Sequence, residues 1–118
     1  MSPWVLGSDQ RHPGLMGTKL VWAWPAALAK AHMRVLVRGK RLDASGATKF
    51  QLGPQFDTAP LTNELRLSTG NTVGSFAGSN WGATVTVIYV PVEGCYGLQL
   101  DWTGGTRTLV FKAARRTQ

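Results

Sequence analysis

Apolar and polar residues alternate with a period of two along much of the chain. In "HMRVLVRGKRLD" (32–43) Val35 and Val37 share one side, and in "NELRLST" (63–69) Leu65 and Leu67 do the same. Successive side chains of a strand point to opposite faces, so this spacing predicts strands with one buried and one wet face. The chain therefore favours a β-sheet whose two faces differ.

Other segments complete this prediction. "LVWAW" (20–24) predicts a strand with Trp22 and Trp24 on one face, and "TKFQL" (48–52) predicts a short strand. "ATVTVIYV" (83–90) is β-branched or aromatic almost throughout, which is typical of a central strand. "PAALAKA" (25–31) has good helix propensity but is short, and it predicts one or two helical turns.

The final two apolar runs predict a hairpin. Gly104 and Gly105 separate them, and a two-residue glycine turn supplies positive φ angles. The expected register sets Leu100 opposite Leu109, Leu98 opposite Phe111, and Trp102 opposite Arg107 as a cation–π pair. One face then buries Tyr96, Leu98, Leu100, Leu109 and Phe111, while the other carries Cys95, Gly97, Gln99, Asp101, Thr108, Val110 and Lys112.

These elements predict an all-β protein with a single domain. Hydrophobic residues make up 43% of the 118, charged residues 16%, and 14 Gly and 6 Pro punctuate the apolar runs. We expect one antiparallel sandwich of about seven strands over residues 20–114. Residues 1–19 are expected to form an irregular arm held by Trp4 and Leu6, and residues 115–118 a basic tail.

The C-terminal third carries a set of residues with a wider resemblance. Tyr89 and Pro91 end one strand in aromatic-x-Pro, and Gly94, Cys95 and Tyr96 follow before the hairpin. In this pattern the chain resembles a group of small, mostly uncharacterised bacterial exported proteins with an immunoglobulin-like β-sandwich. The resemblance implies that fold and an exported setting, but no activity.

Localisation stays open at this level. Residues 1–20 lack the basic start and apolar run of a signal peptide, and no stretch reaches membrane-spanning length. The protein would be exported if a signal peptide had been removed, and cytoplasmic otherwise.

No catalytic or metal site emerges from the residues. Cys95 and Asp101 are six residues apart on one strand, about 20 Å at roughly 3.4 Å per residue, which is too far to share a proton. One cysteine and the two histidines, His12 and His32, match no metal-ligand spacing, so no cofactor is expected. Cys95 is expected to be buried and inert.

The sequence leaves two classes of function open, both of them binding. The net charge of +7 favours a polyanionic partner. The leading hypothesis is a non-catalytic binding module for a protein or a glycan, or for self-association, with a ligand loop at 70–82 that carries Phe76, Asn80 and Trp81. The alternative is nucleic-acid binding through Arg34, Arg38, Lys40 and Arg41.

The strand predicted at 20–24 also suggests self-association. Short strands leave edge groups unpaired, and "LVWAW" has few edge-blocking residues. This predicts a homo-oligomer, most simply a symmetric dimer, with the arm or this strand at the contact.

Overall fold

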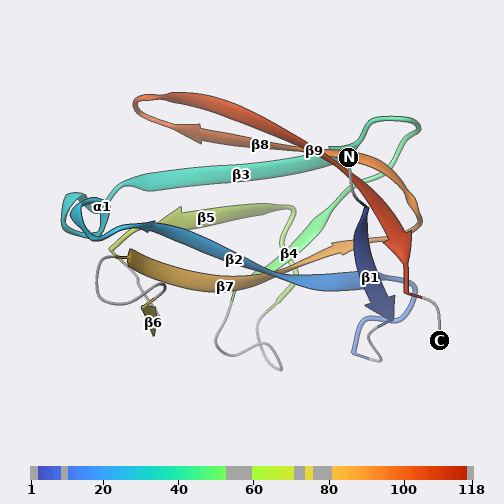
Figure 1. The fold of residues 1–118 in the computed structure, drawn as a ribbon. Coiled ribbons are helices and arrows are strands. Elements are labelled where there is room, and N and C mark those ends of the chain that lie inside the picture. The colour runs from blue at the N-terminus through green and yellow to red at the C-terminus, as the bar shows by residue number, and fades with distance from the viewer. Residues whose placement is uncertain (1–2, 9–10, 53–59, 71–73, 76–80, 117–118) are drawn as a thin grey trace.

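The protein is all-β in architecture. The computed structural model describes residues 3–8, 11–52, 60–70, 74–75 and 81–116 (Figure 1). Within these residues the helix is α1 (Ala26–Ala31), and the nine strands are β1 (Trp4–Ser8), β2 (Met16–Pro25), β3 (Arg34–Arg41), β4 (Lys49–Leu52), β5 (Glu64–Ser68), β6 (Gly74–Ser75), β7 (Trp81–Val90), β8 (Gly94–Trp102) and β9 (Gly105–Arg115). The expected number was about seven.

The strands form one mixed sheet that curves around a single core. Their order is β4-β7-β2-β1-β9-β8-β3-β5, with β6 paired to β7. The two ends of this path approach each other, because Phe50 of β4 and Thr62, just before β5, exchange backbone hydrogen bonds of 2.8 and 2.9 Å. The sheet is therefore nearly closed, like a barrel.

β1 corrects the prediction of an irregular arm and of a wholly antiparallel sheet. Its first half, Trp4–Leu6, pairs in parallel with β9, and its second half, Gly7–Ser8, pairs antiparallel with β2. The Trp4 ring stacks on Phe111 with centroids 4.0 Å apart, and Leu6 is fully buried. Trp4–Ser8 forms a strand because Leu6 is part of the core and Trp4 packs against it, and β2 already begins at Met16.

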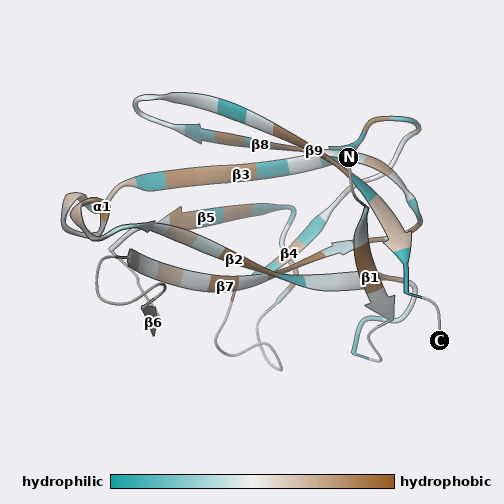
Figure 2. Cartoon of the chain, viewed as in Figure 1, coloured by the Kyte–Doolittle hydropathy of each residue, from teal (hydrophilic) through white to brown (hydrophobic). Residues whose placement is uncertain are grey.

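The core confirms most of the predicted alternation. Val37, Leu65, Leu67, Leu98 and Phe111 are all buried on the inward face of their strands. Figure 2 shows a hydrophobic stretch of β3 between hydrophilic positions. β7 lies between β2 and β4 and is buried along nearly all of its described length, as expected of a central strand.

The region around α1 also follows the predicted pattern. Trp24 is buried and Trp22 half-buried, whereas Val21 and Ala23 on the other face of β2 are exposed. The Trp22 Nε1–H donates to Thr86 Oγ1 at 2.8 Å. None of the helices in the described ranges is long and apolar enough to cross a membrane.

The β8–β9 hairpin forms, but its register differs from the prediction by two residues. The turn lies at Thr103-Gly104, so Leu98 faces Leu109, Leu100 faces Arg107 and Trp102 faces Gly105. The expected pairing of Trp102 with Arg107 is wrong. A shift of two positions keeps every side chain on its predicted face, because the strand period is also two.

Burial in the hairpin is less complete than expected. Leu98 and Phe111 are fully buried, but Leu100 is half-buried and Leu109 is 39% exposed, so the prediction that all four are buried is wrong for Leu109. The reason is geometric, since the hairpin tip projects away from β2 and β7 (Figure 1).

The turn glycines also have a different role from the one predicted. Of the described glycines only Gly14 has a positive φ, so Gly104 and Gly105 do not supply that angle. Instead the Trp102 indole lies over the turn, and a Cβ at Gly104 would stand 3.0 Å from Trp102 Nε1.

Candidate functional site

The outward surface of β5, β3, β8 and β9 concentrates positive charge. Residues directly opposite one another in paired strands share a face, and the partners of Arg38 are Glu64 on β5 and Gln99 on β8. This surface, called here the basic face, carries five cationic side chains, Arg34, Arg38, Lys40, Arg66 and Lys112, and two carboxylates, Glu64 and Asp101. It is therefore net positive.

Asp101 offsets only one of these positive charges, because its ion pair is with Arg38 and its other hydrogen bonds come from neutral groups. Its Oδ1 accepts from Thr106 Oγ1 at 2.6 Å and from Gln99 Nε2 at 3.1 Å. Its Oδ2 accepts from Arg38 Nη2 at 2.8 Å and from Gln99 Nε2 at 3.0 Å. The bonds from Thr106, then Gln99 and Arg38, hold the pKa of Asp101 below its usual range.

β3 brings together three of the four basic residues proposed for phosphate contact. Arg34, Arg38 and Lys40 point outward from alternate positions, and all three are exposed. Arg38 remains 53% exposed despite its ion pair with Asp101. The basic face therefore has an exposed row of cations along one strand.

Arg41 does not belong to that row, because its position puts it on the other face of β3. Its Nε donates to Asp43 Oδ1 at 2.7 Å, and this bond holds the pKa of Asp43 below its usual range. The guanidinium also lies where a Cβ of Gly94 would stand, 2.7 Å from Nε. Arg41 thus fastens the 41–46 turn against β8 instead of facing a ligand.

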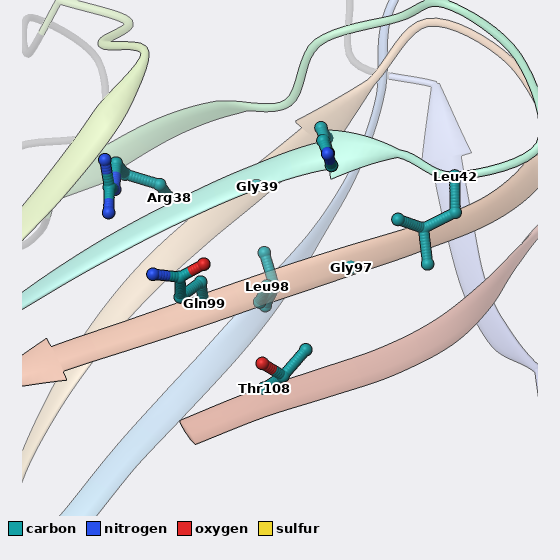
Figure 3. A pocket seen from close by; sticks show the side chains of 8 residues that line it. Arg38, Gly39, Leu42, Gly97, Leu98, Gln99 and Thr108 are labelled. Carbon is teal, nitrogen blue, oxygen red and sulfur yellow. The ribbon is translucent and has the colours of Figure 1, made fainter. Parts of the chain in front are cut away.

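A hollow of about 280 Å³ interrupts the basic face across β3, β8 and β9 (Figure 3). Gly97 has no side chain, and Leu42 leans over it, with its two Cδ atoms 3.3 Å from the position a Cβ would take. The hollow is lined by Arg38, Gly39, Lys40, Leu42, Gly97, Leu98, Gln99 and Thr108. It thus offers two cations, an amide and a hydroxyl to an anionic group.

A second hollow, of about 600 Å³, lies beside the tip of the hairpin. β8 and β3 stop pairing at Asp101 and Leu36, so a notch opens beyond this point. Its lining includes Arg34, Arg66 and the half-buried Trp102. The side chain of Arg66 is 81% exposed, with one contact to Glu64 at 3.5 Å.

The predicted ligand loop at 70–82 contributes nothing that can be described as a site. Phe76 and Asn80 lie outside the described residues. Trp81 opens β7, where its backbone pairs with Pro25, but its side chain also falls outside the description.

Cys95 corrects another expectation. It is half-buried on the outward face of β8 opposite Lys112, and not in the core, because even-numbered neighbours such as Tyr96 and Leu98 take the inward positions. Among the described residues no group of three His, Cys, Asp or Glu side chains could hold a metal ion.

In comparisons with known proteins, no family model, curated protein or solved structure matches the chain.

The sequence placed Gly97, Gln99 and Thr108 on one face of the hairpin and suggested Arg38 and Lys40 for phosphate contact, but it did not join these two sets into one site. Gly97, Gln99 and Thr108 share the alternation of Asp101 and Lys112, which was the available signal. Leu42 lies in a turn, and the alternation of a strand does not predict where the side chain of a turn residue points.

Proposed function

We propose that this protein is a non-catalytic binding module that holds an acidic protein partner on the basic face. In finer classification we propose an immunoglobulin-like sandwich, in which β1 divides the sheet into a β4-β7-β2 layer and a β9-β8-β3-β5 layer around one core. The observation that carries the proposal is the row of exposed cations beside a hollow, with Asp101 already saturated by its own neighbours.

The hollow favours a carboxylate over a sugar ring. Sugar-binding sites commonly use a flat aromatic side chain as a platform, and none of the described residues lining this hollow is aromatic. Lys40 can pair with a carboxylate, and Thr108 can donate a hydrogen bond to it. Arg38 has five N–H donors and remains 53% exposed, so it can contact the same carboxylate while it holds Asp101. Such groups can hold and orient an anionic ligand, which favours a binding role over a catalytic one.

Charge reversal tests the proposal. Lys40→Glu should weaken binding of a fluorescent polyglutamate peptide several-fold, and wild-type binding should fall as salt is added. Lys19→Glu is the matched control, because Lys19 is also an exposed lysine but lies on β2, away from the basic face. Equal weakening by both variants would show a non-specific charge effect and contradict the proposed site.

A steric variant tests the hollow itself. Gly97→Val would add side-chain atoms to its floor, and Leu42, which is 47% exposed, can move aside. Valine suits a strand, so the fold should persist while peptide binding weakens. Unchanged peptide binding to a folded Gly97→Val protein would exclude the hollow as the binding site for the carboxylate.

One observation favours nucleic acid as a second candidate. Arg34 and Trp102 line the same notch, and single-stranded nucleic acid is commonly held by cations beside a stacking ring. In that case a single-stranded oligonucleotide would bind more tightly than polyglutamate at equal salt, and Arg34→Ala would weaken it more than Lys40→Ala.

A further inference from the structure

The edge of β9 is open along most of its length. β9 pairs with β8 from Gly105 to Ala113, whereas β1 covers its other side only at Ala113–Arg115. No strand in the described ranges pairs with the far side of residues 105–112. Pro3, which has no amide hydrogen to give to the ladder, directly precedes Trp4, where β1 begins.

Side chains do not cover this edge either. Every residue from Gly105 to Val110 is exposed. Leu109 is 39% and Val110 45% exposed, and as neighbours in a strand they lie on opposite faces. An incoming strand would thus meet a free backbone ladder and an aliphatic side chain on each face.

The charge of the edge selects among occupants. Arg107 and Lys112 lie near its two ends, and Arg or Lys on an edge strand is a common device against self-pairing. Pairing with a second copy would bring these cations, and two molecules of net charge +7, together. An acidic strand gains from the same charges.

We propose that the open edge of β9 binds an extended, acidic segment of a protein partner as an added strand. This inference rests on the proposed function, and it specifies the conformation of the partner. Backbone hydrogen bonds to residues 105–112 supply affinity. Carboxylates opposite Arg107 and Lys112, with two adjacent aliphatic residues opposite Leu109 and Val110, supply specificity.

The test uses the whole protein and peptides of the pattern Glu-Thr-Val-Val-Thr-Glu, which place one Glu and one Val on each face of an added strand. In an added strand, alternate amides of the peptide point toward β9 and the others away from it. N-methylation of one alternate set should therefore lower affinity at least tenfold, whereas N-methylation of the other set should leave it nearly unchanged. Hydrogen exchange should slow at those amides of 105–112 that point away from β8, toward the open edge.

Other outcomes separate the two proposals. If both N-methylated peptides bind like the parent and Lys40→Glu still weakens binding, strand addition is wrong and the basic face stands. If no acidic peptide binds even at low salt, both proposals fail. If light scattering shows a dimer without peptide, and hydrogen exchange shows that the amides of 105–112 are protected in it, the edge binds a second copy and the inference is overturned.

Discussion

At the level of single residues, Asp101 shows what alternation can and cannot predict. The sequence places it on the outward face with Gln99, but only the folded register brings Thr106 and Arg38 within hydrogen-bonding distance. Arg38 and Arg41 show the same limit, because the sequence suggested both equally as ligand-binding residues. One keeps an exposed guanidinium on the basic face, and the other is held by Asp43 in a turn.

The carboxyl group of Asp101 provides a pH prediction. Because its folded pKa is lowered, its contribution to stability is complete above the pKa it has when unfolded, and is lost as pH falls toward the folded value. Carbon-detected NMR titration should give a midpoint below the usual aspartate range. Thr106→Val, which removes the largest cause, should raise that midpoint. A normal midpoint in the wild type would contradict the described network.

At the level of elements, strand identity was predictable and exact pairing was not. The segments around β3, β5, β7 and the hairpin all form strands, because their patterns have the right period and length. The hairpin register was wrong by two residues because either Thr103-Gly104 or Gly104-Gly105 can form the loop, and both keep the same faces. The sequence did not show that the Trp102 indole lies over the turn.

The corrected register gives unequal costs for two leucines that face each other. Leu98→Ala should lower the free energy of unfolding by about 2 to 5 kcal/mol, because the side chain is fully buried. Leu109→Ala should cost about 1 kcal/mol or less, because its side chain is partly in solvent. Urea denaturation of both variants checks this. Equal losses would restore the register in which Leu109 is buried.

At the level of the whole molecule, the path of the sheet depends on β1. The sequence predicted an all-β chain with one domain from composition and turn residues, but a five-residue strand after a proline gave no clear signal. Its role follows from contacts far along the chain, with β9 and β2. The net charge predicted an anionic partner, but not that β3, β5, β8 and β9 would gather the cations on one face. The homo-oligomer stays a prediction.

Removal of Trp4 tests the role of β1. Trp4→Ala deletes the ring stacked on Phe111 and should cost about 3 kcal/mol, at the low end for a large aromatic residue because Trp4 is half-buried. Val5→Ala is the control, since Val5 is 48% exposed and should change stability by no more than about 0.5 kcal/mol. Thermal or urea unfolding measures both. A neutral Trp4→Ala variant would mean that β1 is dispensable.

The central claim is that the basic face binds an acidic partner, and an NMR titration of backbone amides with polyglutamate tests it most directly. At low salt, shift changes should concentrate around the hollow, at Arg38, Lys40, Gly97, Gln99 and Thr108, and should shrink as salt rises. The amides of β2, β4 and β7 should show no shift changes. Absence of shift changes at low salt, or shift changes centred on β2, β4 and β7, would show that the basic face does not bind the acidic partner.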